Sequence, residues 1–260
     1  MGAFDIDQYY LCHVSFFGTN FHGWQKQPSV PTLQSYFEQK SKSIFGEAFK
    51  KIIGCSRTDA GVHADNYYFL LIAGRKLSLS EVNTYLCIND TREGIKVFSF
   101  KHVEKFSIIN VETRKHYIYR FSLKDKYLDA HNILNIVEDL DPVKMVEGAS
   151  FFNGEHDFKL FTIGDTSRKK TRRTILNSSL KYDKDSEVFE FNVESCGFLR
   201  YQIRYMVGAL INLGNGNKTL EQLKESLSGK EKSGFLTPSR GLTLAQVFFE
   251  YHVKTLRPLP

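Results

Sequence analysis

The first hundred residues alternate between the two hydrophobic periodicities that distinguish strands from helices. Aromatic and β-branched residues dominate Gln8–Phe17, whereas apolar residues recur at helical spacing over Thr32–Phe45. A Ser78-x-x-Glu81 capping box opens a second helix that ends at Leu86. Three further segments are typical of strands: Lys51–Cys55, Tyr67–Ala73 and Gly94–Val103. The order β-α-β-β-α-β predicts a ferredoxin-like arrangement, with two helices on one face of an antiparallel sheet.

The second half alternates in the same way, with less regular spacing. Tyr117, Tyr119 and Phe121 occupy alternate positions of Lys115–Leu123 and predict a half-buried strand. Leu199–Leu213 carries the broad apolar stripe of an amphipathic helix. The other predicted elements are a helix over Val143–Ala149 that begins at Pro142, strands over Arg173–Tyr182 and Val188–Val193, a helix from a Thr219-x-x-Gln222 capping box to Leu227, and a strand over Leu242–Val253.

We therefore predict an α+β protein made of two ferredoxin-like halves, residues 1–106 and 107–260. The join, near Glu104–Thr113, is neither Gly/Ser-rich nor Pro-rich, so we do not expect a flexible linker. Two antiparallel sheets without a flexible linker between them would pack edge to edge and leave a cleft across the joint face. The order of elements suggests duplication, although no sequence repeat demonstrates it.

Composition and charge narrow the class of protein only modestly. The chain has 260 residues, with 35 Lys and Arg against 29 Asp and Glu, which gives a formal net charge of +6. This charge permits a polyanionic partner without requiring one. The four cysteines are widely separated and no Cys/His cluster has metal-ligand spacing, so we expect a cytoplasmic protein with reduced thiols and no bound metal. No signal peptide or membrane-spanning run is apparent, so we expect no membrane association.

One short segment, Gly54–Ala64, has the properties of a reactive loop. It breaks a strand with small and turn-forming residues and carries Arg57 and Asp59. Rigid scaffolds commonly present reactive groups on loops at strand ends, and Arg57 could hold Asp59 ionised by charge pairing. The alternative is structural, because Asp-Ala-Gly is a favourable turn in which the aspartate satisfies backbone amides. Spacing alone favours the turn.

The same segment resembles the active-site signature G-R-T-D-A-G-V-H-A of the TruA-type tRNA pseudouridine synthases, with Ser56 in place of the usual glycine. Five other segments resemble further motifs of that family, in the right order. They are the N-terminal motif at Phe17–Gln27, K-x-Y-x-Y at Lys115–Tyr119, G-x-H-D-F at Gly154–Phe158, F-L-x-x-x-V-R-x-M-V-G within Gly197–Gly208, and the C-terminal G-L-x-L after Arg240. The resemblance covers nearly the whole chain.

The resemblance implies isomerisation of uridine to pseudouridine in tRNA, in the anticodon stem-loop (positions 38–40), by a homodimer without a cofactor. The uracil is detached at N1, rotated and rejoined through C5. By analogy Asp59 is the catalytic aspartate, acting either on the ribose or on the base. A glycosidase normally needs two carboxylates, whereas a reaction that returns the same base to the same sugar can use one.

The resemblance also assigns residues to the substrate. Tyr117 would lie over the target uracil, where base stacking contributes about 1–3 kcal/mol; core packing is the alternative. Arg57 and Arg204 match family arginines and would pair with Asp59 or with a phosphate, whereas the alternative for Arg204 is a solvated helix face. Trp24 is expected to pack. Contacts to RNA, against local hydrogen bonding or simple solvation, are expected from His22, Gln25, Gln27, Arg168, Lys169, Lys170 and Arg200.

Two segments depart from the family pattern. Cys87–Arg92 stands where the family usually has a Leu-Pro segment. Phe106–Ile109 replaces the motif F-H-A-R, so Ile109 stands in place of an arginine. That loop would help to hold RNA, and we therefore expect intact chemistry with altered recognition. The alternatives are the same isomerase acting on another RNA or tRNA site and a non-catalytic RNA-binding protein, although binding alone does not require a carboxylate near a polyanion.

Overall fold

The chain forms two compact units in the computed structural model. The first unit comprises Met1–Thr113 and Gln246–Pro260, and the second comprises Arg114–Ala245. The structure describes residues 7–105, 108–109, 111–123, 132–136, 139–164, 170–232 and 234–249. Helices and antiparallel strands alternate in both units, which confirms the predicted α+β class. The edge-to-edge joint and the cleft stay predictions, as does the division at residues 106 and 107.

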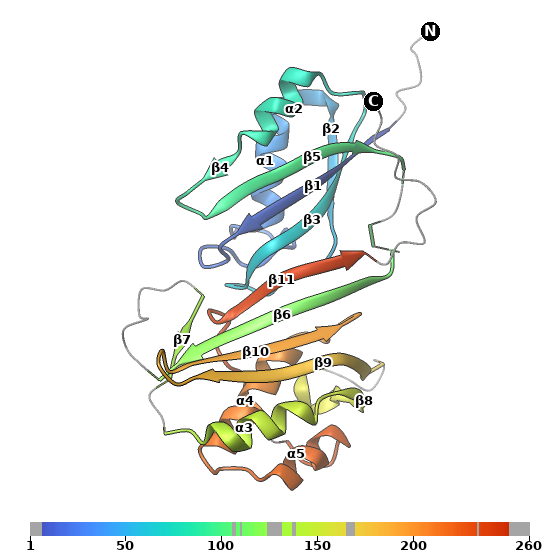
Figure 1. Cartoon of the computed structure of the whole chain (residues 1–260). Helices are drawn as coiled ribbons and strands as arrows, with labels where there is room; N and C mark the ends of the chain where they lie inside the picture. The colour runs from blue at the N-terminus through green and yellow to red at the C-terminus, as the bar shows by residue number, and fades with distance from the viewer. Residues whose placement is uncertain are drawn as a thin grey trace. The chain divides into compact units, whose positions relative to one another are not determined.

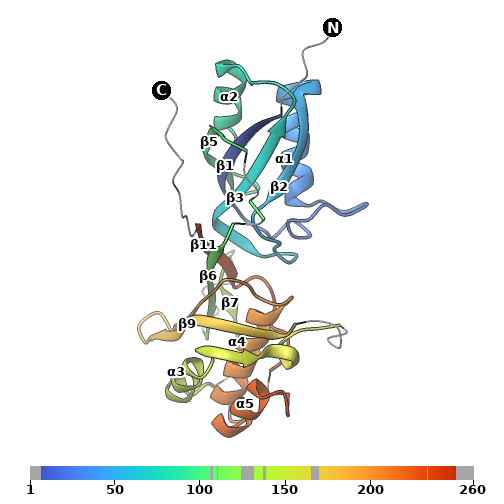
Figure 2. The ribbon, with the colours of Figure 1, turned by 90° about the vertical axis from the view of Figure 1, so that its right-hand side faces the viewer.

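The first unit has the predicted ferredoxin-like order. Its elements are β1 (Gln8–Phe16), α1 (Leu33–Phe45), the 3-10 helix η1 (Gly46–Ala48), β2 (Phe49–Gly54), β3 (His63–Ala73), α2 (Leu79–Leu86), β4 (Asn89–Asp90) and β5 (Ile95–Val103). The four long strands pair antiparallel in the order β5-β1-β3-β2, and the two-residue β4 pairs with β5. Helices α1 and α2 lie together on one face of this sheet (Figures 1 and 2).

Local sequence explains why these elements form. On β1 every second side chain from Tyr10 to Phe16 is buried, which is the two-residue period of a strand with one face on the core. Helix α1 buries every fourth side chain, as an amphipathic helix does. Both helices begin at complete capping boxes, on Thr32 and on Ser78. The Ser78 box places α2 at the residues expected from the sequence.

The second unit repeats the ferredoxin-like order with additions. Its elements are β6 (Thr113–Ser122), β7 (Leu134–Asn135), α3 (Pro142–Ser150), β8 (Gly154–Asp157), the 3-10 helix η3 (Phe158–Phe161), β9 (Arg172–Asp183), β10 (Val188–Ser195), α4 (Gln202–Gly214), α5 (Leu220–Leu227) and β11 (Leu242–Phe249), the last of which is divided between the units. The strand order is β11-β6-β10-β9-β8. Helices α3, α4 and α5 gather on one face of the strands (Figure 2).

Several details differ from the sequence-based expectation. Helix α4 begins at Gln202 rather than Leu199, because Tyr201 adopts a left-handed conformation with φ of 65°. The short strands β4, β7 and β8 were not predicted, since two to four residues carry no usable periodicity. The final strand is described only to Phe249, and its predicted continuation to Val253 lies outside the described residues. In the described part of the chain, no helix is long and apolar enough to cross a membrane.

Candidate active site

Asp59 lies in the loop that joins β2 to β3. The backbone N–H of Val62 donates to the carbonyl oxygen of Asp59 at 3.2 Å, and Gly61 has a positive φ of 77°. The turn that the sequence allowed as an alternative is therefore present. The hydrogen bond that closes this turn is accepted by the backbone carbonyl of Asp59. The Asp59 side chain is half-buried, and the neighbouring Arg57 is exposed.

The loop between β1 and α1, residues 17–32, supports the Asp59 loop through backbone hydrogen bonds, and we call it the supporting loop. The N–H of Gly61 donates to the carbonyl oxygen of Phe21 at 3.1 Å. The N–H of Trp24 donates to the carbonyl oxygen of Thr58 at 3.3 Å. The two bonds lie on either side of Asp59, so the backbone that carries the carboxylate is fixed from both directions.

Two glycines of the same supporting loop allow this close approach. A Cβ atom on Gly18 would lie 2.1 Å from the carbonyl oxygen of Val62, and one on Gly23 would lie 2.4 Å from that of Thr58. The N–H of Gly18 also donates to Nδ1 of the buried His63 at 3.2 Å, so Nδ1 is the accepting nitrogen of that ring. No role was predicted for Gly18, Gly23 or His63 from the sequence. The two glycines lie inside the N-terminal motif Phe17–Gln27, and that position was their only signal.

Trp24 anchors the base of the supporting loop. Its side chain is 2% exposed, and its ring centroid lies 4.2 Å from that of Tyr67 and 6.1 Å from that of Phe37. The Tyr67 hydroxyl in turn donates to the backbone carbonyl of Ser56, within the Asp59 loop. The prediction that Trp24 packs is confirmed, and its packing connects the core to the reactive loop.

The polar residues of the supporting loop are at the surface. His22, Gln25 and Gln27 are exposed. Nε2 of Gln25 donates to Oε1 of Gln34 at 2.9 Å, and Nε2 of Gln27 donates to the carbonyl oxygen of His22 at 2.9 Å. The local hydrogen bonds named as the alternative are thus present for both glutamines. Contact with RNA stays a prediction for all three residues.

Tyr117 lies on β6, in the second unit. Its side chain is 7% exposed, and its ring meets that of Phe198 edge-on, with the centroids 5.4 Å apart. The packing alternative is therefore present, and stacking on uracil stays a prediction. Tyr119, on the same face of β6, donates its hydroxyl to the carbonyl oxygen of Pro238 at 2.6 Å, and burial raises the pKa of Tyr119 to about 12.

Arg204 lies in the first turn of α4 and is tightly held. Its Nε donates to the carbonyl oxygen of Thr237 at 2.6 Å, and the hydroxyl of Thr237 donates to the carbonyl oxygen of Arg204 at 3.0 Å. The side chain is half-buried, so it is not the freely solvated group that was the alternative. Arg200, just before the helix, is exposed.

The predicted site residues are distributed over both units. Arg57 and Asp59 belong to the first unit, and Tyr117 and Arg204 belong to the second. A single site built from all four stays a prediction. Lys170 is exposed and lies two residues before β9, whereas Arg168 and Lys169 lie outside the described residues, as do Phe106 and Ser107. Ile109, at the departure from the family pattern, is 68% exposed.

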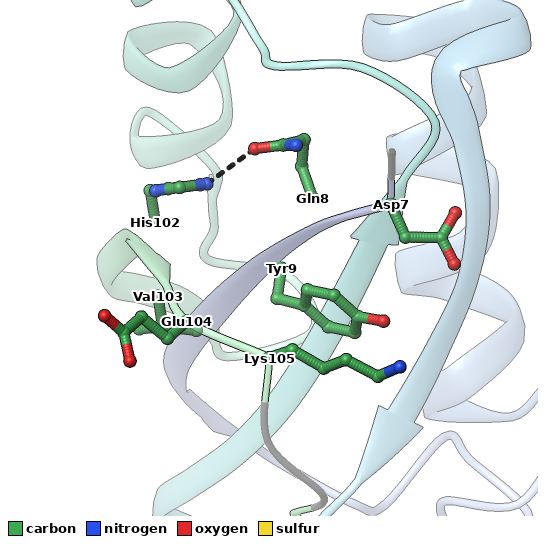
Figure 3. A pocket seen from close by; sticks show the side chains of 7 residues that line it. All are labelled: Asp7, Gln8, Tyr9, His102, Val103, Glu104 and Lys105. Carbon is green, nitrogen blue, oxygen red and sulfur yellow. Dashed lines mark hydrogen bonds between the residues drawn. The ribbon is translucent and has the colours of Figure 1, made fainter. Parts of the chain in front are cut away.

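A pocket of about 560 Å³ lies at one end of β1 and β5 in the first unit (Figure 3). Nε2 of His102 and Oε1 of Gln8 are hydrogen-bonded at 2.8 Å beside it. Its lining residues are Asp7, Gln8, Tyr9, His102, Val103, Glu104 and Lys105. None of them is a predicted site residue, so this pocket does not coincide with the Asp59 loop.

Comparison with known proteins gives a consistent result. A family model described as tRNA pseudouridine synthase matches residues 149–250. The chain is 31% identical to tRNA pseudouridine synthase A of Clostridium kluyveri, over 91% of this chain and 97% of that protein. It is 30% identical to the Aquifex aeolicus protein of that name, over 92% of this chain and 98% of that protein. It is 32% identical to the Mesoplasma florum protein of that name, over 93% of this chain and 98% of that protein.

Among solved structures, the crystal structure of a pseudouridylate synthase matches 79% of this chain and 58% of its own, with 10% identity and a TM-score of 0.32, too low to support an argument. The curated relatives and the α+β fold define a pseudouridine synthase, an isomerase. More specifically, the chain belongs to the tRNA pseudouridine synthase A family, which confirms the resemblance seen in the sequence.

Proposed function

We propose that the chain converts uridine to pseudouridine in the anticodon stem-loop of tRNA (positions 38–40), with Asp59 as the catalytic residue. The observation that carries the proposal is the Asp59 loop itself. Its backbone is held by hydrogen bonds to Phe21 and Trp24 on either side of the aspartate. Catalytic groups need this kind of fixed placement. Family membership supplies the class of reaction.

The reaction balances without an external reagent. The bond between N1 of uracil and C1′ of ribose breaks, and a bond between C5 and C1′ forms. The proton on C5 leaves, and N1 gains one, so the product is an isomer of the substrate. No oxidant, reductant or cofactor takes part. The Asp59 carboxylate acts as the nucleophile, on the ribose or on the base, and Arg57 holds it ionised by its positive charge.

Other residues hold the substrate in this proposal. Tyr117 provides an aromatic wall for the uracil, and Arg57 and Arg204 pair with Asp59 or with a phosphate. Contacts to the rest of the RNA come from His22, Gln25, Gln27, Arg168, Lys169, Lys170 and Arg200. The enzyme acts in the cytoplasm as a homodimer that binds one tRNA across both subunits, as the family resemblance implies.

A second candidate is the same isomerisation at another RNA or tRNA site. The exposed Ile109 favours it, because this residue stands where the family pattern has an arginine in a loop expected to hold RNA. An apolar side chain cannot contribute the phosphate contact of a guanidinium. The third candidate, a non-catalytic RNA-binding protein, has no observation in its favour.

Site-resolved pseudouridine mapping on unmodified tRNA transcripts tests the proposal, with the purified protein and its Asp59→Ala variant. We expect modification in the anticodon stem-loop by the wild type alone, because the variant keeps the RNA-binding surface and lacks the carboxylate. The Kd for tRNA of the two proteins should agree within about threefold, since only one small side chain on the RNA-binding surface changes.

Three outcomes would contradict the proposal in whole or in part. Wild-type turnover by the Asp59→Ala protein refutes the catalytic assignment. Modification of tRNA outside the anticodon stem-loop refutes the proposed position and supports the second candidate. If the wild type leaves tRNA unmodified, the same mapping on total cellular RNA separates an enzyme with another substrate from a protein that only binds RNA.

A further inference from the structure

Arg204, in the first turn of α4, is held by residues 234–241, the segment that precedes β11. Its Nε donates to the carbonyl oxygen of Thr237 at 2.6 Å, and the hydroxyl of Thr237 donates back to the carbonyl oxygen of Arg204 at 3.0 Å. Thr237 is 1% exposed, so water has little access to this reciprocal pair. The terminal nitrogens Nη1 and Nη2 form the bidentate edge that matches a carboxylate or a phosphate. The contact with Thr237 thus holds the guanidinium at Nε and not at its terminal edge.

The segment 234–241 lies directly against the backbone of α4. A Cβ atom on Gly208 would lie 2.1 Å from the carbonyl oxygen of Phe235, and one on Gly234 would lie 2.3 Å from that of Tyr205. Only glycine allows two backbones to approach each other so closely. Because no side chain separates the segment from the helix at these points, backbone packing fixes the position of the segment along α4.

Tyr119, on β6, holds the same segment at the residue after Thr237. Its hydroxyl donates to the carbonyl oxygen of Pro238 at 2.6 Å, and its side chain is fully buried. A Cβ atom on Gly241 would lie 2.7 Å from Cε1 of the Tyr119 ring, and the carbonyl oxygen of Gly241 accepts from the N–H of Arg120 at 2.9 Å. The segment is therefore fastened both to α4 and to β6.

The Tyr119 hydroxyl acts in this contact as a hydrogen-bond donor and not as an acid or a base. Burial raises the pKa of Tyr119 to about 12, so the hydroxyl keeps its proton at neutral pH. Tyr117, two positions earlier on the same strand, is the residue that the proposed function assigns to the uracil. A buried hydroxyl that keeps its proton and donates to the backbone contributes by holding other groups in place.

We propose that Tyr119 and Thr237 are positioning residues that fix the Arg204 guanidinium in the orientation that the reaction uses. The inference rests on the proposed function, which pairs Arg204 with Asp59 or with a phosphate. It goes further because it gives a role to two residues to which the proposed function assigns no contact with the substrate. Such support matters because a misplacement of about 1 Å can slow an enzymatic reaction by about a hundredfold.

Two substitutions loosen the segment 234–241 and keep the arginine. Tyr119→Phe removes the hydroxyl that donates to Pro238. Thr237→Val removes the hydroxyl that donates to the carbonyl oxygen of Arg204 and keeps a side chain of the same shape. For each protein the experiment measures pseudouridine formation in a single turnover, the Kd for a tRNA transcript and the melting temperature.

Tyr85→Phe is the matched control. The Tyr85 side chain is also fully buried, and its hydroxyl is hydrogen-bonded to Oγ of Ser41 at 3.1 Å, in the first unit. All three variants should melt within a few degrees of one another, since each loses one buried hydrogen bond. The control therefore separates the loss of a buried hydroxyl from the loosening of the segment 234–241.

Exchange of the Arg204 Nε proton with water, followed by NMR, reports the contact with Thr237 directly. The signal is assigned with Arg204→Lys, in which it disappears. We expect the exchange to be about fivefold faster or more in Tyr119→Phe and Thr237→Val, because each loses one hydrogen bond of the segment. Tyr85→Phe should exchange as the wild type does.

The rate of the reaction should respond more than the binding of tRNA. We expect the single-turnover rate to fall about tenfold in Tyr119→Phe and Thr237→Val, because the guanidinium is no longer fixed. The Kd for tRNA should stay within about twofold of the wild-type value, since every positive charge remains. Tyr85→Phe should keep both the rate and the Kd.

Unchanged exchange of the Arg204 Nε proton in either variant would overturn the role of that residue, and faster exchange without slower turnover would overturn the inference as a whole. An equal loss of turnover in Tyr85→Phe also contradicts it, because general destabilisation would then explain the result. The exchange measurement does not depend on turnover. A wild type that makes no pseudouridine in tRNA therefore refutes the proposed function separately, while the exchange still decides whether the two residues fix the guanidinium.

Discussion

At Gly23 the close packing of two loops leaves no room for a side chain. Its φ is 83°, and an added Cβ would lie 2.4 Å from the carbonyl oxygen of Thr58, one residue before Asp59. Gly23→Ala must therefore displace the backbone that carries the proposed catalytic carboxylate. We expect turnover to fall at least about tenfold and the free energy of unfolding to fall by about 1–3 kcal/mol. Single-turnover pseudouridine formation and urea unfolding measure the two effects.

Gly46 provides a matched control in the same unit. It also has a positive φ, 54°, but a Cβ there meets nothing within 4 Å. Gly46→Ala should therefore show the backbone effect alone, a loss of about 1–3 kcal/mol of stability with unchanged turnover. Equal losses of turnover in the two variants would mean that general destabilisation, and not displacement of the Asp59 loop, explains the result.

Glu81, in the first turn of helix α2, makes several contacts at once. Glu81 accepts from the N–H of Ser78 at 2.7 Å, which completes the capping box, and from two guanidinium nitrogens of Arg75 at 2.8 and 3.0 Å. The hydrogen bonds from Arg75, followed by the bond from Ser78, lower the pKa of Glu81 from 4.5 to about 2. A carboxylate whose pKa is lower in the folded state stabilises the fold above its unfolded pKa.

We expect Glu81→Gln to reduce the free energy of unfolding at pH 7 by about 0.5–1 kcal/mol. The amide preserves the capping box and loses the ion pair, and the effect is modest because Arg75 is half exposed to water. The difference from the wild type should shrink as the pH falls from 4.5 towards about 2, where the wild-type carboxyl becomes protonated. Urea unfolding at pH 7 and pH 3 in low salt measures it. A difference that does not change with pH contradicts the assignment.

The elements that sequence could predict are those specified by local contacts. The capping boxes at Ser78 and Thr219 place α2 and α5 correctly, because each box involves residues only three positions apart. The start of α4 was wrong by three residues because Tyr201 leaves the helical conformation, which is not visible in a periodicity. The short strands β4, β7 and β8 exist only through their partner strands.

In the candidate site, too, the features that could be predicted are those formed by residues close together in the sequence. The motif around Asp59 identified the candidate carboxylate, and its turn could be anticipated from Asp-Ala-Gly. The bond from Gly18 to His63 joins residues 45 positions apart, so no local pattern predicts it. The local hydrogen bonds of Gln25 and Gln27 likewise could not be predicted, because the sequence is equally compatible with contact between these glutamines and RNA.

At the scale of the whole molecule, the net charge of +6 predicts that RNA binding depends strongly on salt. We expect each cation of the run Arg168–Lys170 to contribute more to this salt dependence than an average surface cation, because cations adjacent in sequence can contact successive phosphates. Replacing all three with glutamine lowers the net charge from +6 to +3. The slope of log K against log salt should decrease by about 2, since each phosphate contact contributes about 0.7–0.9.

The control for this experiment has the same net charge and keeps Arg168–Lys170 unchanged. Lys42, Lys76 and Lys184 are exposed lysines elsewhere on the described surface, and replacing them with glutamine also gives +3. If the run Arg168–Lys170 binds the RNA backbone, its variant binds tRNA much more weakly at 50 mM KCl (about the low end of the useful range), and the control changes little. The kcat at saturating tRNA should be unchanged in both, because neither set includes Asp59. Equal salt slopes in the two variants would show that RNA binding responds to total charge, and the run Arg168–Lys170 would then have no special role.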